Sequence, residues 1–214
     1  MARVAGLLTT VTPTHGIYAA DGVPVELHAR EPVALRMLYL HAERAAAAAP
    51  ARAIVVGPLL RELVERTLES GALDANEPAD GHLIEVIFDE VAALEATPFV
   101  LPLPTDARAL RAAEHCLAVL DAPPSTRTLA ARAGTSARTL ERLFSAQTGF
   151  SLGLWQRRFR LLAAERALGA GASVTDAAYD AGYASPSAFI AAYRRTFGAT
   201  PGRARGTAPR EGRQ

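Results

Sequence analysis

Lysine is absent from this sequence, cysteine occurs once, and long apolar runs are missing. All 23 basic residues are arginines, and Cys116 is the one thiol among 214 residues. A single cysteine excludes an internal disulfide and is compatible with a reducing compartment. No run reaches the roughly 18 apolar residues of a membrane span, and the apolar start at Met1–Leu8 is too short for a secretory signal. We therefore expect a cytoplasmic protein that does not bind a membrane.

Histidines are few and scattered along the chain. His15, His28 and His41 are too far apart for a local ligand pair, and no His-x-His pattern occurs. Metal sites need convergent ligands, so we interpret these histidines as structural or solvent-exposed and expect no metal and no cofactor. Cys116 lies beside an apolar helical stripe and is expected to be a small buried hydrophobe.

The formal net charge of +1 conceals two oppositely charged halves. Residues 1–124 hold 9 arginines against 17 acidic residues, a net charge of −8, whereas residues 125–214 hold 14 against 5, a net charge of +9. Arginines neutralise phosphates and release counterions, which dominates nucleic-acid affinity. The charge pattern therefore predicts a polyanionic partner for the C-terminal half.

The N-terminal part is predicted to contain short strands. Strand-forming patterns run from Gly6 to Leu40, with a hairpin-like turn at Asp21-Gly22 and a β-rich apolar run at Val33–Leu40. One further short strand is expected at Ile54–Val56. Such a small set of strands forms a sheet that cannot close on itself.

Helices are predicted to follow these strands. After a connection at residues 45–50, amphipathic acidic helices are expected at 58–69 and 81–95, a natural helical hairpin or dimer surface. Three prolines near Phe99–Pro104 indicate an extended linker before a new domain, which would open with a helix at 106–120.

One pattern occurs twice between Ser125 and Pro201. The first copy reads Ala130-x-x-x-Gly134, Ser136, Leu140, Phe144 and Gly149. The second reads Ala178-x-x-x-Gly182, Ser185, Phe189, Tyr193 and Gly198. A small alanine permits close helix packing, the glycine permits a left-handed turn, and the serine caps the next helix. The chain thus predicts two helix-turn-helix units.

A single helix is predicted between the two copies, from Ser151 to Leu168. About eighteen helical residues span roughly 27 Å, close to the roughly 34 Å of one DNA turn. A rigid helix of that length suits one chain that reads two adjacent major grooves.

These motifs closely resemble the DNA-binding domain of the AraC/XylS transcription regulators over Asp106–Arg205. The similarity rests on Leu129 to Ser136, Leu140, Arg142, Phe144 and Gly149, on Arg160 and Ala164, and on Val174, Gly182, Tyr183, Ser185, Ser187, Phe189, Phe197, Gly198 and Pro201. The resemblance implies that helices 136–147 and 185–197 enter the major groove of promoter DNA. It also implies contact with RNA polymerase. Most members of the family activate transcription, and the resemblance leaves repression open.

The first recognition helix would expose Arg138, Glu141 and Arg142. Either arginine can pair with guanine and the glutamate can accept from a cytosine amino group, at roughly 1 to 3 kcal/mol per pair. Alternatively, Glu141 pairs with Arg138 or Arg142 on the helix surface. The second recognition helix offers small residues for weaker readout, Ser187, Ala188 and Ala191.

Other positions are expected to contact phosphates or to fill the core. The candidate phosphate contacts are Ser136, Arg157, Arg158, Arg194 and Arg195. The helical spacing of the aromatic residues favours a core role over base stacking for Phe144, Trp155, Phe159, Phe189 and Tyr193. Ser173-x-x-Asp176 is expected to be a capping box.

A second resemblance covers the front of the chain. Gly22-Val23-Pro24, the run at 33–40 and the helix at Pro58 resemble the last strands and first helix of the cupin-type regulatory domain of one AraC branch. Val25 stands where related sequences often carry histidine, which argues against a histidine-based site. A cupin barrel needs about twice as many strands. Either the recorded start is internal, or half a barrel remains and a partner covers its edge.

The sequence therefore predicts a mainly α protein. A partial cupin-like β region (1–56) precedes a helical hairpin and linker (57–104), an all-α DNA-binding domain with two helix-turn-helix units (105–205) and a disordered tail (206–214). The leading hypothesis is a sequence-specific, homodimeric, non-enzymatic transcription regulator that responds to a small-molecule effector. One alternative is a small-molecule-binding or enzymatic cupin with a DNA-binding tail, and another is a truncated regulator that binds DNA without effector response.

Overall fold

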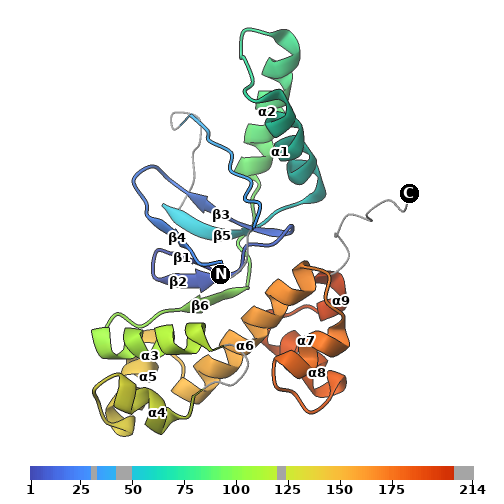
Figure 1. The fold of residues 1–214 in the computed structure, drawn as a ribbon. Helices are drawn as coiled ribbons and strands as arrows, with labels where there is room; N and C mark the ends of the chain where they lie inside the picture. The colour runs from blue at the N-terminus through green and yellow to red at the C-terminus, as the bar shows by residue number, and fades with distance from the viewer. Residues whose placement is uncertain (30–32, 42–49, 120–123, 205–214) are drawn as a thin grey trace.

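The computed structural model describes residues 1–29, 33–41, 50–119 and 124–204. Two small sheets occupy the middle, a helical pair rises on one side, and the remaining helices lie on the other (Figure 1). In chain order the elements are β1 (Ala2–Val4), β2 (Leu7–Thr9), β3 (His15–Ala19), β4 (Val25–Leu27), β5 (Ala51–Val55), α1 (Pro58–Ser70), α2 (Pro78–Ala92), β6 (Val100–Pro102), α3 (Ala107–Ala118), α4 (Thr126–Arg132), α5 (Ala137–Thr148), α6 (Leu152–Gly169), α7 (Val174–Asp180), α8 (Pro186–Phe197) and α9 (Pro201–Ala204).

The strands form two open antiparallel sheets. One has the order β4-β1-β2-β6, and the other pairs β3 with β5. In the larger sheet Leu8 lies opposite Leu101, and both side chains are buried. The short strand predicted at 54–56 is found as β5, beginning three residues earlier.

Two predictions for the β region are wrong. Asp21-Gly22 does form a turn, with Gly22 at φ 74°, but β3 and β4 do not pair with each other. They join different sheets, because β4 pairs with β1 and β3 with β5. The run Val33–Leu40 is not a strand, and Val33 and Tyr39 are 69% and 83% exposed. An apolar β-prone run becomes a strand only where a partner and a packing face exist.

The predicted linker at 99–104 is extended, but it is part of the sheet. Strand β6 pairs with β2, and Leu101 and Leu103 are buried. Prolines are tolerated in this position because β6 is an edge strand. The segment therefore joins the β region to the helices instead of separating them. The predicted connection at 45–49 and the predicted tail at 206–214 lie outside the described residues.

The two predicted acidic helices are present as α1 and α2, and they pack as a hairpin. Leu60 and Leu63 of α1 and Ile87 of α2 are buried. The pair extends away from the C-terminal helices (Figure 1). Among the described residues, no helix is long and apolar enough to cross a membrane.

The predicted helix-turn-helix units are present as α4–α5 and α7–α8. The turn glycines Gly134 and Gly182 have φ of 68° and 75°, a left-handed conformation that other residues adopt only with strain. Five helices begin at serines whose hydroxyls accept a backbone N–H of the first turn, namely Ser125, Ser136, Ser151, Ser173 and Ser185. The aromatic residues predicted to fill the core are buried, and so is Cys116.

Helix α6 lies between the two helix-turn-helix units, and the β region packs against α6 as well. Trp155 Nε1 donates to the carbonyl oxygen of Pro102 in β6 at 2.7 Å. Near the opposite end, Gly169 packs so tightly on Thr12 that an added Cβ would lie 2.9 Å from the Thr12 side chain. Leu8, Phe99 and Leu101 belong to the same core as the C-terminal helices. The sheet and the helices thus share one continuous core.

A buried polar cluster completes this contact. Glu165 of α6 is fully buried, and one carboxylate oxygen accepts a hydrogen bond from the Tyr193 hydroxyl of α8. The other lies 3.4 Å from Nδ1 of His15 in β3. Burial raises the pKa of Glu165 to about 7, with the Tyr193 hydrogen bond opposing, and burial lowers the pKa of His15 to about 4. The titratable side chains that face this carboxylate in the described structure are therefore His15 and Tyr193.

We predict opposite pH dependences of stability for variants of this pair. Folding raises the Glu165 pKa from 4.5 to about 7, so this group makes the protein less stable as pH rises through that window. Folding lowers the His15 pKa from 6.5 to about 4, so that group makes the protein more stable as pH rises between those values. Relative to the unchanged protein, Glu165→Gln should gain stability from pH 4.5 to 7, by at most about 3 kcal/mol, and His15→Gln should lose it from pH 4 to 6.5.

Urea unfolding at half-unit pH steps measures both differences, because each variant is compared with the unchanged protein at the same pH. Difference curves that stay flat for both variants would show that neither group titrates differently in the folded state.

Candidate nucleic-acid interface

The two recognition helices begin within one residue of the predicted positions. Helix α5 starts after its cap Ser136 and α8 after its cap Ser185. They lie near the two ends of α6, on the side away from the sheets (Figure 1). Each is held from behind by buried aromatic residues, Phe144 in α5 and Phe189 and Tyr193 in α8. The opposite face of each helix is left for a partner.

Helix α5 presents two arginines to solvent. Arg138 and Arg142 are exposed and lie four residues apart, so they share one face of the helix. Ser136, predicted to contact a phosphate, is exposed, and its hydroxyl accepts the Thr139 N–H at 3.1 Å. This part of α5 therefore combines a helix N-terminus with two exposed guanidinium groups.

Glu141 has a partner that neither sequence interpretation anticipated. One carboxylate oxygen accepts the backbone N–H of Leu152 at 3.1 Å, at the start of α6. Within the described residues it makes no ion pair with Arg138 or Arg142. The carboxylate thus stabilises the positive end of α6 and joins the two helices.

Helix α8 presents a surface of small side chains. Ser187, Ala188 and Ala191 are exposed as predicted, and Arg194 and Arg195 are exposed in the last turn. The sequence interpretation missed Ile190, which is 36% exposed. Its position three residues after Ser187 was the available signal, because that spacing places both on one face.

The linker-helix arginines differ in their surroundings. Arg157 is exposed, whereas Arg158 is half-buried with its guanidinium carbon 4.4 Å from the centre of the Phe150 ring. Arg160, missed as a site residue, lies over the Tyr183 ring at 5.9 Å. Its Nη1 would be 2.8 Å from a Cβ added at Gly182. Arg160 therefore packs against the turn of the second unit.

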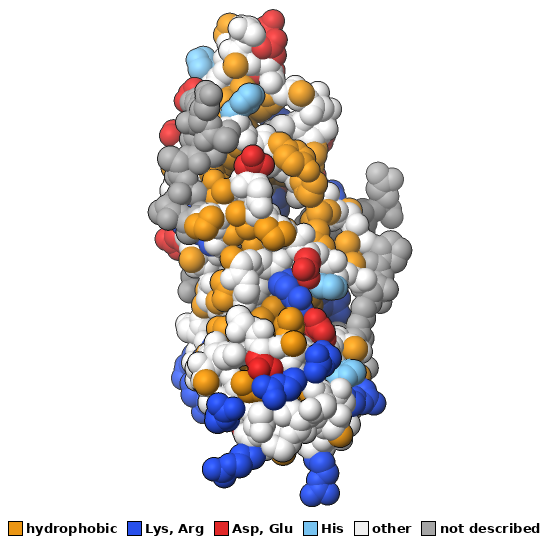
Figure 2. All heavy atoms as spheres, turned by 90° about the vertical axis from the view of Figure 1, so that its left-hand side faces the viewer, with side chains coloured by type: hydrophobic (Ala, Val, Ile, Leu, Met, Phe, Trp, Pro, Cys, Tyr) orange, Lys and Arg blue, Asp and Glu red, His pale blue; other side chains and the backbone are white. Residues whose placement is uncertain are grey.

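Positive charge collects around the two recognition helices. The exposed arginines described between residues 124 and 202 are Arg127, Arg132, Arg138, Arg142, Arg157, Arg166, Arg194 and Arg195. On the face that includes the first unit, arginines gather in the lower part, whereas acidic side chains are spread from the top into the lower half (Figure 2). No three His, Cys, Asp or Glu side chains of the described part are placed to hold a metal ion. The arrangement suits a polyanion better than a small cation.

Known proteins resemble the chain in this region and beyond it. A transcriptional regulator of Chromobacterium violaceum, described as having an AraC-type DNA-binding domain, is 28% identical with a TM-score of 0.46, covering 49% of this chain and 95% of that chain. The DNA-binding domain of AdpA in complex with a target DNA is 34% identical with a TM-score of 0.40, covering 47% of this chain and 91% of that chain.

Curated regulators match as well. The HTH-type transcriptional regulator NimR of Escherichia coli is 29% identical over 206 residues, covering 94% of this chain and 73% of that protein. RipA of Corynebacterium glutamicum, also an HTH-type transcriptional regulator, is 36% identical over 105 residues, covering 47% of this chain and 30% of that protein. Residues 129–207 match the family described as a helix-turn-helix domain. The C-terminal part of the chain is thus an AraC-type helix-turn-helix domain, and the protein is a DNA-binding transcription regulator.

Proposed function

We propose that the protein binds double-stranded promoter DNA in a sequence-specific way, with α5 and α8 in successive major grooves. The observation that carries this proposal is the placement of two capped helix-turn-helix units at the ends of one buried helix of 18 residues. Such a helix is about 27 Å long, close to the rise of about 34 Å for one turn of DNA. Acting on promoter DNA places the protein in the cytoplasm.

The two units contribute differently to recognition in this proposal. Arg138 and Arg142 read guanine, since both are exposed on one face of α5. Glu141 is assigned to the α5–α6 junction because its carboxylate already caps α6. Ser187, Ala188 and Ala191 of α8 permit a close approach to bases and contact with thymine methyl groups. The phosphate contacts are Ser136, Arg157, Arg158, Arg194 and Arg195.

The acidic front of the chain serves assembly and regulation in the same proposal. Residues 57–104 form the homodimer, and residues 105–205 bind DNA. Leu59 and Leu68 of α1 support the first assignment, because these leucines are 51% and 45% exposed and lie on the two flanks of the buried face formed by Leu60 and Leu63. Bound at a promoter, the dimer contacts RNA polymerase, and a small-molecule effector acts through the β region.

We predict that base-reading and phosphate-binding arginines are separable. Arg142→Ala should relax sequence preference at one base pair, at a cost of about 1 to 3 kcal/mol for the preferred sequence. Arg157→Ala, the matched control, should weaken all sequences equally and reduce the slope of log affinity against log salt by about 0.9. Selection from random duplexes followed by fluorescence anisotropy across a salt series measures both effects. If both variants keep the full preference of the unchanged protein, Arg142 does not read a base.

We predict that α1 carries the dimer contact. Leu59→Asp combined with Leu68→Asp should convert a dimer into a monomer without loss of fold, because both side chains are largely exposed within one chain. Sedimentation equilibrium gives the mass, and circular dichroism reports the fold. Glu62→Gln, an exposed change on the same helix, is the control and should leave the dimer intact. A monomeric unchanged protein at tens of micromolar would contradict this assignment.

A further inference from the structure

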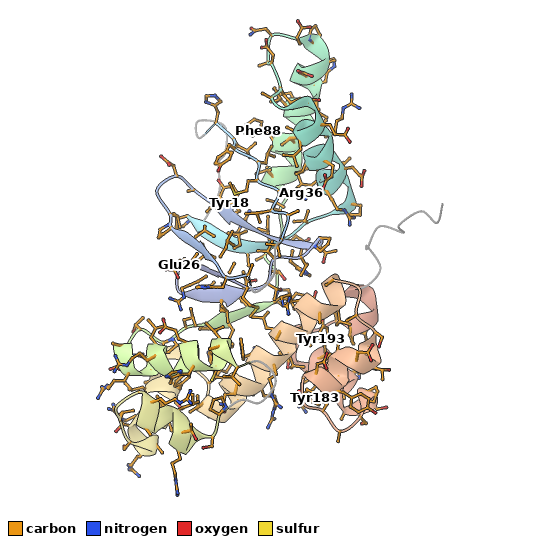
Figure 3. All side chains as sticks on the ribbon, in the orientation of Figure 1. Tyr18, Glu26, Arg36, Phe88, Tyr183 and Tyr193 are labelled. Carbon is orange, nitrogen blue, oxygen red and sulfur yellow. The ribbon has the colours of Figure 1, made fainter. Side chains whose placement is uncertain are left out.

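Helix α8 is connected to the front of the chain through one buried carboxyl group. Glu165 lies near the end of α6, and its side chain has no exposed surface. Its two carboxylate oxygens face different elements: one accepts from the Tyr193 hydroxyl of α8, and the other lies 3.4 Å from His15 Nδ1 of β3. Tyr193 lies where α6 meets the second helix-turn-helix unit (Figure 3).

Packing alone does not account for these polar groups. The Tyr193 ring sits among other aromatic rings, with centroid distances of 5.6 Å to Phe189, 5.0 Å to Phe197 and 5.9 Å to Phe99. A phenylalanine would fill that volume equally well, and a leucine in place of Glu165 would avoid burying a carboxyl group. The Tyr193–Glu165 hydrogen bond adds an orientational constraint, because it fixes how α8 lies against α6. The second carboxylate oxygen faces His15 at 3.4 Å and has no hydrogen-bond partner among the described residues.

The histidine end of the contact is itself firmly held. His15 Nδ1 lies 3.2 Å from the Thr12 hydroxyl and 3.1 Å from the Thr14 hydroxyl. Its ring packs edge-to-face with the Phe99 ring, with the two ring centroids 4.6 Å apart. Strand β3 pairs with β5 along its whole length, and His15 lies opposite Val55. Strand β5 leads through Gly57 into α1. The cluster thus links β3 to the recognition helix α8 through Glu165 of α6.

The first helix-turn-helix unit is positioned by other contacts. Glu141 caps α6, and the Gln147 side-chain oxygen accepts the N–H groups of Thr105 and Asp106, both at 3.0 Å. Trp155 bonds to Pro102 at the same end of α6. None of these contacts involves Glu165. A change at Glu165 therefore affects α7–α8 and leaves α4–α5 in place.

We propose that Glu165 is a positioning residue for DNA binding, which sets the orientation of α8 against α6 and the N-terminal sheet through Tyr193 and His15. The inference rests on the proposed reading of DNA by α8. Arg194 and Arg195 follow Tyr193 directly in the chain, and Ala191 lies two residues before it. A rotation of α8 about Tyr193 moves these residues off the DNA.

The test is hydroxyl-radical footprinting of the full chain on a duplex selected by the unchanged protein. The unchanged protein should protect two successive grooves. Glu165→Leu and Tyr193→Phe should lose protection of the groove read by α8 and keep the other, with affinity lowered about tenfold. Glu165→Gln should keep the protection of both grooves, because the oxygen of a side-chain amide can still accept the hydrogen bond from the Tyr193 hydroxyl. Tyr193→Phe removes a single oxygen, so it remains informative if Glu165→Leu does not fold.

Tyr183→Phe is the matched control. It also removes one hydroxyl group from the second unit, and that hydroxyl has no hydrogen-bond partner among the described residues. This variant should protect both grooves (Figure 3 labels both tyrosines). If Tyr193→Phe and Glu165→Leu protect both grooves as the unchanged protein does, Glu165 is a packing residue only and the inference is overturned. A footprint of the unchanged protein confined to one groove would contradict the two-groove function itself, and the inference with it.

Discussion

The burial of helix α6 is the constraint on which the rest of the structure depends. Four large side chains of α6 are at most 1% exposed, namely Trp155, Phe159, Leu162 and Leu168. They belong to the core that α6 shares with the sheet and the other helices. The sheet covers α6 from one direction, and the two helix-turn-helix units pack against its ends from the other (Figure 1). A helix held in this way bends little, since movement would break a densely packed core. The separation of α5 and α8 follows from its length.

The charge of the chain is arranged around this helix. The half that contains α4 to α8 is basic, whereas the half that contains α1 and α2 is acidic. Attraction to phosphates therefore orients the protein with its recognition helices toward DNA. The same charge separation disfavours contact between the acidic helical hairpin and DNA. The helical hairpin and the recognition helices thus lie toward opposite ends of the molecule (Figure 1).

The N-terminal sheet contacts the DNA-binding helices at both ends of α6, so a change in the position of the sheet would be transmitted to those helices. Trp155 and Pro102 join them at one end of α6, and His15 and Glu165 at the other. Since Leu8 and Leu101 belong to the same core as the helices, the sheet cannot shift without repacking that core. A ligand or partner that binds one arrangement of the sheet better than another would therefore bias the recognition helices.

The helices could be predicted because their signals lie within a few residues of the sequence. Contacts between residues far apart in the sequence could not be predicted from such local signals. The helix-turn-helix units were recognisable because Gly134, Ser136 and their counterparts determine a turn and a cap within a few residues. Strand β6 was not, because its partner β2 lies more than ninety residues earlier in the chain. The run at 33–40 was mistaken for a strand for the same reason, since β structure depends on a partner that the run itself does not reveal.

The same distinction holds for the candidate site, where exposure could be predicted from the sequence and long-range partners could not. The exposure of Arg138, Arg142 and the small residues of α8 followed from helical periodicity. The role of Glu141 did not, because its partner Leu152 is brought near only by the turn between α5 and α6. The meeting of His15 with Glu165 joins residues 150 positions apart, and neither has a sequence signal for the other.

The most direct test of the central claim, that α6 is a rigid spacer, is the response of affinity to DNA inserted between the two grooves. A rigid helix about 27 Å long cannot span any added spacing. We therefore expect insertions of about 5 and about 10 base pairs, a half turn and a full turn, to remove the contribution of the second unit equally. Retention of affinity with the full-turn insertion, but not with the half-turn insertion, would show that the two units are flexibly joined, and would contradict the account.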